Sequence, residues 1–522
     1  MPSLWRRLDF THAHLVCIIS FEWTHERSNL LINERSSWRA IELPLDALAV
    51  DRNIEEPIQR QIYAALRDLI LRRILPPGLR LPSTRELAKD IVVSRNTVVA
   101  AYDQLASEGY IESRQGAHTF VVDLPLQPAR PAPASPLSGS NYLSRAGRLM
   151  METGVIGAHP HENALRASTP DVESFPFKTW NRLLARRFKA SNTDLFSYNY
   201  VSGYPPLQQA IASYLQAYRG VRCAPEQVVI TSGAQGALDL IARLLLSEGD
   251  TVWMEEPGYF GAQVLFSAVG ARLEPMNVDE NGWDLGSVPD GPVRLIYTTP
   301  SCQQPLGQTM LMEQRLRLLD IARQKNAWII EDDFDSEYRL AGTSVPSMQG
   351  IDTAGRTIYV GTFAKTLFPA LRIGFMVLPQ PIDADIGKAI FASGHLVSLP
   401  LQATLSDFIE SGQFARHLRR TRRLYGQRRA LFLSLIDTLL GDWLEPIEAD
   451  VGIQIAFRFK RDMDDQSLAR RANERRLNVT PLSRHYLHGA PTHGLVLGYA
   501  ALDERQMQLH LTELRNVFED SG

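Results

Sequence analysis

The chain has 522 residues, 44% of them hydrophobic and 22% charged, a composition that fits a folded protein and excludes a disordered or collagen-like chain. No run of 18 or more uncharged apolar residues occurs, so a membrane span is not expected. The net charge of −3 excludes a polybasic chain. The three cysteines, Cys17, Cys223 and Cys302, are too scattered for a disulfide framework, and no His/Cys/Asp group has the spacing of metal ligands. We therefore expect a cytoplasmic protein without a metal site.

Residues 1–39 fit no folded pattern and are predicted to be a poorly ordered extension. Residues 5–7 and the apolar stretch 15–19 resemble the start of a signal peptide, but Ser20 and Glu22 interrupt the apolar stretch. No small-residue cleavage site follows. We expect that the first 36 residues can be deleted without loss of function.

Residues 40–123 are predicted to form a small domain that begins with two helices. Apolar residues recur at helical spacing over 57–73. Ser83 and Glu86 then form a capping box, in which each side chain accepts a hydrogen bond from the other residue's backbone. The helix that starts there is expected to end near Asp90.

A third helix and a hairpin complete this domain. Ser94 is predicted to cap a helix over 95–105, and Gly109 lies just past its end, where a left-handed cap favours glycine. The runs 110–113 and 118–122 flank a turn, as the strands of a β-wing do. Three helices followed by a hairpin make a winged helix-turn-helix.

The geometry of this fold points to DNA, because the third helix presents its first side chains to the major groove. Residues 57–122 hold nine basic and six acidic side chains, a positive surplus on a chain that is acidic overall. This surplus favours DNA over a protein partner, which is the alternative use of the fold. The residues expected to contact bases or phosphates are Arg85, Ser94, Arg95, Asn96, Thr97 and Arg114.

Residues 124–160 are predicted to be a linker, because 124–139 hold five prolines and one charge. Residues 161–522 are predicted to form a large α/β domain with a mostly parallel central sheet covered on both faces. From Glu445 onward the pattern shortens to strand, helix, strand, strand, helix, which indicates a smaller C-terminal α/β lobe. The strand-like runs of the large sheet are 228–231, 251–255, 293–299, 327–332, 357–362 and 373–378, and the clearest helical runs are 234–246 and 311–325.

Three strand ends carry residues suited to a flat, anionic ligand. The glycine-rich turn 231–236 follows a strand and opens a helix, so its free N–H groups can hold an anion. Tyr259 follows a second strand, where an aromatic ring can stack on a flat cofactor ring. The polar loop 299–307, which contains Gln304, follows a third strand, where α/β folds place ligand contacts.

Two further strand ends carry charged residues. Asp332 ends an apolar strand and is suited to pair with a protonated pyridine nitrogen, whereas Asp335 and Glu337 are predicted to lie in a solvated acidic loop. Lys365 follows another strand within a small and apolar stretch, where desolvation makes an amine a Schiff-base nucleophile. Thr362 and Arg372, on either side of Lys365, are natural phosphate partners.

These motifs carry a family resemblance. The segments 81–88, 94–102 and 105–111 resemble the DNA-binding domain of GntR-type bacterial regulators, and residues 165–518 resemble fold-type I aminotransferases. The chain after residue 40 thus resembles MocR/GabR-type regulators of the GntR family. The resemblance implies a bacterial transcription factor with a PLP-dependent transferase fold type I domain and a pyridoxal 5'-phosphate (PLP) cofactor. It also implies a small amine or amino-acid effector and a homodimer, usually head-to-tail.

The resemblance assigns roles to individual residues. It implies that Lys365 carries the cofactor as an internal aldimine, that Asp332 pairs with the pyridine nitrogen and that Tyr259 stacks on the ring. Arg484 falls where it can meet an effector carboxylate; a solvent-exposed arginine is the alternative. The residues implied in phosphate binding are Ser232, Gly233, Ala234, Gln235, Thr362 and Arg372.

The sequence departs from the family pattern in both domains. Phe334 stands where a tyrosine is usual, and the Gln304 amide is a candidate replacement for the lost hydroxyl. Cys302 stands where histidine is common, and Ala364 replaces a frequent serine. Cofactor binding is still expected, because the lysine, the aspartate and the arginine of the pattern remain.

In the small domain, Ile91-Val92-Val93 replaces a Leu-Gly-Val turn, and Ala117-His118 replaces a Ser-Gly wing tip.

The preferred hypothesis is a PLP-dependent transcriptional regulator that senses a small amine by aldimine formation, without net turnover. One alternative is a working aminotransferase with an attached DNA-binding domain. Another is a regulator whose large domain is a cofactor-free dimerisation scaffold.

Overall fold

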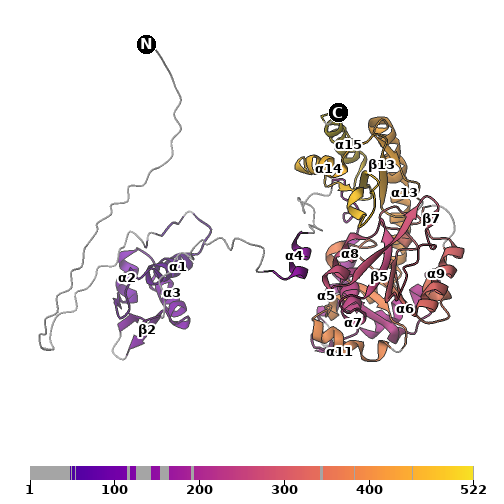
Figure 1. The fold of residues 1–522 in the computed structure, drawn as a ribbon. Helices are drawn as coiled ribbons and strands as arrows, with labels where there is room; N and C mark the ends of the chain where they lie inside the picture. The colour runs from indigo at the N-terminus through magenta and orange to yellow at the C-terminus, as the bar shows by residue number, and fades with distance from the viewer. Residues whose placement is uncertain are drawn as a thin grey trace, which may run out of the picture. The chain divides into compact units, whose positions relative to one another are not determined.

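The computed structural model describes residues 48, 50–52, 54–114, 118–124, 143–152, 164–189, 193–340, 345–380, 382–449 and 451–520. The chain divides into two compact units, Met1–Pro136 and Leu137–Gly522 (Figure 1). The predicted extension 1–39 lies outside the described residues, as does most of the predicted linker. Within the linker range, however, α4 (Arg145–Glu152) is a helix that packs against α8 (Phe260–Ala268) of the second unit. None of the described helices is long and apolar enough to cross a membrane.

The first unit is the winged helix predicted from the sequence. Its elements are α1 (Ile58–Leu71), β1 (Arg80–Leu81), α2 (Thr84–Asp90), α3 (Arg95–Ser107), β2 (Ile111–Arg114) and β3 (His118–Val121). The predicted capping box is present, and Ser94 caps α3 by accepting from the Thr97 N–H. The strand β1 was not predicted; it pairs with β3, so the wing belongs to an antiparallel sheet of order β1-β3-β2. Leu66, Leu87 and Val98 form its buried core.

The second unit is built on an eight-stranded sheet of order β4-β11-β10-β9-β8-β5-β6-β7. The strands β4, β5, β6, β8, β9 and β10 run parallel, whereas β11 is antiparallel to both of its neighbours and β7 is antiparallel to β6. The mostly parallel sheet is therefore confirmed. The bounds are β4 (Val228–Thr231), β5 (Thr251–Glu256), β6 (Arg272–Asp279), β7 (Gly282–Trp283), β8 (Leu295–Thr298), β9 (Trp328–Asp333), β10 (Thr357–Thr362) and β11 (Gly374–Val377).

Alternating side chains along the strands build two cores, one on each face of the sheet. On one face Tyr297 and Ile330 pack with α7 (Ala234–Leu245) and α8. On the other face Ile296 and Ile329 pack with α9 (Met312–Lys325). Successive residues of a strand point to opposite faces, so this alternation also fixes the directions of the acidic residues that end β9. The other helices of this region are α5 (Phe177–Lys189), α6 (Pro205–Arg219), α10 (Met348–Ile351), α11 (Ile386–Ser393) and α12 (Leu399–Glu410).

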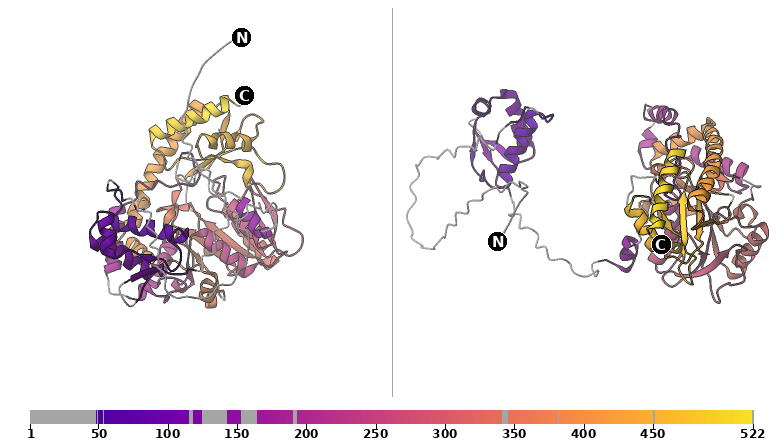
Figure 2. Two further views of the ribbon diagram at one scale, coloured as in Figure 1. Left: turned by 90° about the vertical axis from the view of Figure 1, so that its left-hand side faces the viewer. Right: turned by 90° about the horizontal axis from the view of Figure 1, so that it is seen from above.

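A smaller lobe follows at one end of the large sheet (Figures 1 and 2). The 28-residue helix α13 (Gln413–Leu440) leads into it and contacts both α12 and the C-terminal helix. The lobe has an antiparallel sheet of order β12-β13-β15-β14. Two strands precede its first helix where the sequence pattern predicted one. The bounds are β12 (Leu444–Pro446), β13 (Gln454–Phe459), α14 (Asp465–Glu474), β14 (Thr480–Pro481), β15 (Gly494–Gly498) and α15 (Glu504–Glu519).

Candidate functional site

Asp332 and Lys365 come from the carboxyl ends of neighbouring parallel strands. The register pairs Val360 of β10 with Asp332 of β9, and Lys365 follows three residues after β10 ends. The Lys365 Nζ donates to the Ser168 carbonyl oxygen at 2.7 Å, and the Tyr338 hydroxyl donates to the Lys365 carbonyl oxygen at 3.4 Å. The lysine is half-buried. Desolvation lowers its pKa, although the charges of Asp335 and Asp332 raise it.

The Asp332 carboxylate has one bonded and one unbonded oxygen. Its side chain is buried, with 3% of the residue exposed, and its Oδ2 accepts a hydrogen bond from the Tyr297 hydroxyl at 2.8 Å. Its Oδ1 is buried without a hydrogen-bond partner. Burial raises the pKa of Asp332 from 3.8 to about 7, against the lowering effect of the Tyr297 hydrogen bond. An acceptor of this kind fits a cationic N–H group, because a buried charge is costly without a partner.

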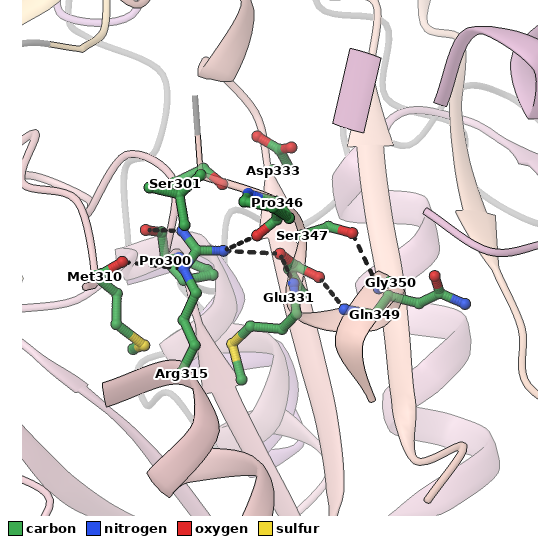
Figure 3. Close-up of polar contacts among 12 residues, drawn as sticks. Pro300, Ser301, Met310, Arg315, Glu331, Asp333, Pro346, Ser347, Gln349 and Gly350 are labelled. Carbon is green, nitrogen blue, oxygen red and sulfur yellow. Dashed lines mark hydrogen bonds and ion pairs between the residues drawn. The ribbon is translucent and has the colours of Figure 1, made fainter. Parts of the chain in front are cut away.

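The residues on either side of Asp332 face the other side of the sheet, where each is paired with a buried arginine. Glu331 lies 3.6 Å from Arg315, and neither side chain is exposed (Figure 3). Glu331 also accepts from the backbone N–H groups of Met348 and Gln349. Asp333 is bound by Arg219, whose second nitrogen donates to Ser301 at 2.6 Å. These contacts hold the end of β9 and leave Asp332 for the opposite face.

The glycine-rich turn forms a cradle at the first turn of α7. Gly233 adopts a φ of +83°, which favours glycine, and a Cβ there would lie 3.7 Å from the Arg372 guanidinium. The Arg372 Nη2 donates to the Ser232 carbonyl oxygen at 2.9 Å. A Cβ at Gly236 would lie 2.3 Å from the Ser232 Oγ. The backbone therefore approaches this spot closely, and the helix N-terminus and Arg372 both attract an anion.

Three further predicted residues lie around this cradle. Tyr259 precedes α8, and a Cβ at Gly261 would lie 2.6 Å from its ring. The Gln235 amide nitrogen donates to the Gly261 carbonyl oxygen at 3.4 Å, while the Gln235 Oε1 is buried without a partner. The Thr362 Oγ1 accepts from the Ala364 N–H at 3.2 Å, which fixes the start of the lysine loop. The sequence-predicted phosphate residues, Ser232, Gly233, Ala234, Gln235, Thr362 and Arg372, thus come from three adjacent elements.

Gln304 belongs to a hydrogen-bond chain that reaches the lysine. Its Oε1 accepts from the Gln454 amide at 3.0 Å, and the Gln454 Oε1 accepts from the Ser168 hydroxyl at 2.7 Å. The Ser168 carbonyl then accepts from Lys365. The carbonyl end of the Gln304 amide is therefore already bonded within the protein. Neither Ser168 nor Gln454 was predicted, because no motif marks them and only tertiary folding brings them here.

Arg484 lies at the edge of this region. Its guanidinium carbon is 4.4 Å from the ring centroid of Phe260, the residue after Tyr259, and the side chain is half-buried rather than solvent-exposed. Desolvation lowers its pKa. A guanidinium on an aromatic face near the site is suited to meet a carboxylate.

The predicted solvated acidic loop is wrong for Asp335. Its side chain is fully buried, beside a small apolar cluster of Cys302, Phe334 and Val451. Glu337 is half-buried and accepts from the Tyr214 hydroxyl at 3.1 Å. A run of acidic residues and a serine is hydrophilic in sequence, and only the packing of the C-terminal lobe encloses it.

The residues predicted to contact DNA lie on α2, at the start of α3 and at the end of β2. Arg85, Arg95 and Asn96 are exposed, whereas Thr97 is half-buried and its hydroxyl lies 2.7 Å from the Ser94 Oγ. Ser94 and Thr97 are thus engaged in the helix cap. The Arg114 side chain lies outside the described residues.

One group of possible metal ligands was not visible in the sequence. Asp464, Asp465 and His493 place one ligand atom each within 4.8 Å of one another. Asp464 accepts from two N–H groups at the start of α14, and Asp465 accepts from the N–H groups of Ser483 and Gly494. Both carboxylates therefore have a structural role, because each accepts hydrogen bonds from backbone N–H groups.

The residues present fit PLP. Asp332 offers an unbonded buried oxygen for the pyridine nitrogen, Lys365 offers a desolvated amine, and the Gly233 turn with Arg372 offers an anion cradle that a Cβ would crowd. This donor set matches the three distinct parts of that cofactor: the ring nitrogen, the aldehyde and the phosphate.

Comparisons with known proteins agree with the two units. Residues 166–513 match the family "Aminotransferase class I and II", and residues 58–121 match "Bacterial regulatory proteins, gntR family". The chain is 47% identical to the probable rhizopine catabolism regulatory protein MocR of Rhizobium meliloti, over 91% of this chain and 97% of the relative. It is 29% identical to the pyridoxine biosynthesis transcriptional regulator PdxR of Corynebacterium glutamicum, over 90% and 98%.

Solved structures show the fold of the second unit. The α-aminoadipate aminotransferase LysN of Thermus thermophilus matches with a TM-score of 0.66 at 24% identity, covering 74% of this chain and 99% of that structure. The fold and the matches define a class: bacterial regulators that join a winged helix-turn-helix to an aminotransferase-type domain. The chain belongs to the GntR family and, within it, to the MocR-like regulators. It is a DNA-binding transcriptional regulator.

Proposed function

We propose that this regulator binds PLP at Lys365 and that a small amine or amino acid, sensed at the same place, changes its affinity for operator DNA. The observation that carries the proposal is the Asp332 carboxylate, buried with one unbonded oxygen at the end of β9 beside the lysine strand. A buried polar atom without a partner is rare in folded proteins and calls for an explanation. A pyridine N–H supplies one.

Each part of the cofactor has a partner in this arrangement. The N–H groups of the α7 N-terminus and Arg372 would hold the phosphate, Tyr259 would pack against the ring, and Asp332 would hold a proton at the ring nitrogen. When bound, PLP supplies an aldehyde carbon that reacts with amines and a ring that withdraws electrons. Desolvation of Lys365 raises the share of its neutral, nucleophilic form at a given pH.

The effector is proposed to be a primary amine that competes with Lys365. Because such an amine releases the lysine side chain, it alters the contacts of Lys365 with Ser168, whose hydroxyl bonds Gln454 of the C-terminal lobe. An effector that binds two arrangements of the protein with different affinity shifts the balance between them. Half-buried Arg484 supports an effector that carries a carboxylate.

The proposal also includes operator DNA and a second copy of the chain as partners. The exposure of Arg95 and Asn96 at the start of α3 supports contacts with base edges in the major groove. Exposed aromatic pairs, Phe188 with Phe196 and Tyr198 with Phe391, at centroid distances of 5.6 and 5.9 Å, support a homodimer, and the family resemblance implies its head-to-tail arrangement. Exposed apolar groups of this kind mark association surfaces. We place the protein in the cytoplasm, where operator DNA is accessible.

The test is the visible absorption spectrum of the purified full chain, with and without added PLP, beside Lys365→Ala. We expect a visible band in the wild type and none in the variant. No band in the wild type with excess PLP would contradict the proposal and favour the cofactor-free scaffold. Keto-acid production from amino donors is expected to be negligible; sustained production would favour an enzyme instead.

A further inference from the structure

The first half of α13 carries a dense group of basic side chains. Residues 413–429 hold seven arginines and no aspartate or glutamate. The chain as a whole has a net charge of −3, and residues 57–122 have a positive surplus, so the remaining residues are acidic in sum. A run of like charges in such a background calls for a reason. The arginines are Arg416, Arg419, Arg420, Arg422, Arg423, Arg428 and Arg429.

Four exposed arginines lie on the side of α13 that points away from the protein core. The buried side of the helix includes Phe414, Leu418 and Tyr425. At 3.6 residues per turn, the four arginines fall on the opposite side of the helix. We call this set the arginine face; it consists of Arg416, Arg419, Arg420 and Arg423.

The arginine face does not stabilise the helix that carries it. Arg416 and Arg420, like Arg419 and Arg423, are four residues apart, a spacing at which like charges on a helix repel each other. All four lie in the N-terminal half of α13, whereas the helix dipole favours basic side chains near the C-terminal end. Among the described residues, Arg419 and Arg423 have no hydrogen-bond or ion-pair partner. A helix face that meets only solvent more often mixes charges of both signs, so this face fits an anionic partner.

The buried side of α13 holds the arginine face in place. The Tyr425 hydroxyl oxygen accepts from the Asp171 N–H at 2.8 Å. The Thr421 Oγ1 lies 3.3 Å from the hydroxyl oxygen of Tyr338, which also donates to the Lys365 carbonyl oxygen. The helix is thus fixed against the segments that surround the lysine. Charges on a fixed helix lose little conformational freedom when they bind a partner.

We propose that the arginine face is a second DNA-contact surface, which binds phosphate groups of the same duplex that the winged helix reads. A guanidinium group donates two parallel hydrogen bonds to a phosphate. From Arg416 to Arg423 the helix rises by about 10 Å, a length over which B-DNA presents several phosphates. A duplex bound by the first unit is also held near the second at a high effective concentration. The contact adds affinity without reading sequence, and it does not depend on PLP.

The test is the salt dependence of DNA binding by the full chain, measured by fluorescence anisotropy. The probe is a labelled duplex of random sequence, about 60 base pairs long, between roughly 50 and 200 mM salt. We expect Arg419→Gln/Arg423→Gln to weaken binding and to lower the slope of log affinity against log salt by about 2 in magnitude, since each lost phosphate contact removes about 0.9. Arg419→Lys/Arg423→Lys, which keeps both charges, should retain the wild-type slope. An unchanged slope in the glutamine variant would overturn the proposal.

Arg461→Gln/Arg470→Gln is the matched control, because it removes two exposed arginines of the same unit and changes the net charge equally. Arg461 lies near the C-terminal end of α13, since its neighbour Lys460 donates to the Gly441 carbonyl oxygen at 2.7 Å. That end is roughly 27 Å along the helix from Arg423. Salt screens charges beyond about 10 Å, so the slope should change by less than about 0.5. A decrease as large as in the α13 variant would mean that net charge alone sets the slope.

A second copy of the chain is the competing partner of this face. Sedimentation velocity without DNA should give the same oligomeric state for the wild type, the α13 variant and the control. Loss of an oligomer in Arg419→Gln/Arg423→Gln alone would refute DNA contact, because the second copy would then cover the arginine face. Circular dichroism checks that the helix is intact; if it is not, Arg416→Gln/Arg423→Gln provides another pair on the same face.

Discussion

The Arg219 Nε lies 2.7 Å from the Oδ2 of Asp333, the residue directly after Asp332, and both side chains are buried. The Tyr359 hydroxyl donates to the same oxygen at 2.5 Å. Burial alone would raise the pKa of Asp333, but the Arg219 charge and the hydrogen bonds from Tyr359 and Arg219 together outweigh burial and hold this pKa below its ordinary value. Adjacent residues of one strand therefore differ in their preferred charge state: pairing with Arg219 favours the anion of Asp333, whereas burial favours the protonated form of Asp332.

Removal of Arg219 should unfold the second unit more easily, because it leaves Asp333 charged and unpaired. Arg219→Met is expected to lower the free energy of unfolding by about 3–5 kcal/mol. Chemical denaturation followed by tryptophan fluorescence measures this. Arg458→Met is the control: Arg458 pairs with Glu445 on the surface at 2.7 Å, and its loss should cost about 1 kcal/mol or less. Equal losses of unfolding free energy in the two variants would mean that the buried ion pair stabilises the protein no more than the surface pair does.

The stability of the cofactor-free protein should fall as pH rises from about 4 to about 7. Asp332 and Asp335 have ordinary pKa values of 3.8 and folded values of about 7, raised chiefly by burial. In this window the folded state binds more protons than the unfolded state, so their contribution is complete below pH 4 and is lost as pH passes 7.

Thermal unfolding between pH 4.5 and 8 measures this dependence, and Asp332→Asn should make it shallower. Asp333 has a lowered pKa, so its contribution changes only below the window. A wild-type profile that rises across the window would show that these carboxyl groups are charged in the folded state at all these pH values.

Local signals in the sequence were sufficient for much of the fold. The Ser83 capping box and the Ser94 cap are interactions between residues three apart, so the sequence shows both partners at once. Asp332 and Lys365 were found because Asp332 lies at the end of a strand and Lys365 follows one, and the ends of parallel strands meet at one edge of a sheet. The direction of β11 was not predictable, since an apolar strand carries no mark of parallel or antiparallel pairing.

The site residues that the sequence did not predict make contacts with residues far away in the sequence. Lys365 bonds Ser168, which lies 197 residues earlier, and Gln304 bonds Gln454, which lies 150 residues later. Asp335 was expected in solvent because its neighbours in sequence are polar; the Val451–Ile453 segment that buries it belongs to another lobe. Such residues become visible only once the chain is folded.

The cradle at α7 should not tolerate a methyl group at residue 236. In Gly236→Ala the new Cβ would lie 2.3 Å from the Ser232 Oγ, so Ser232 must move. We expect PLP affinity, measured by absorbance titration, to fall roughly tenfold, or about 1.4 kcal/mol. Gly387→Ala, in helix α11, has no atom closer than 3.9 Å to the new Cβ and should leave affinity unchanged. Equal affinity in both variants would place the phosphate elsewhere.

Arg85 should contribute to DNA binding through a phosphate. It is exposed on α2, next to the capping box, so Arg85→Gln is expected to weaken binding to all duplex sequences alike. The slope of log affinity against log salt should decrease in magnitude by about 1. Arg72→Gln serves as the control, since Arg72 pairs with Asp68 at 3.0 Å on α1. A change confined to one operator sequence would indicate a base contact instead.

Val92 shows how the turn before α3 forms without the glycine that the family pattern favours. It adopts a left-handed φ of +54°, and 72% of the residue is exposed. A β-branched residue in this region costs roughly 1–2 kcal/mol, whereas glycine there loses about 0.5–1 kcal/mol through the entropy of the unfolded chain. The side chain packs little, so Val92→Gly should raise the free energy of unfolding of the winged helix by about 0.5–1 kcal/mol. Differential scanning calorimetry of the full chain would detect this as a higher transition temperature for the first unit. Val92→Ala, which keeps a Cβ in the same conformation, should gain less, and a loss of stability in Val92→Gly would show that the valine side chain stabilises the turn through packing.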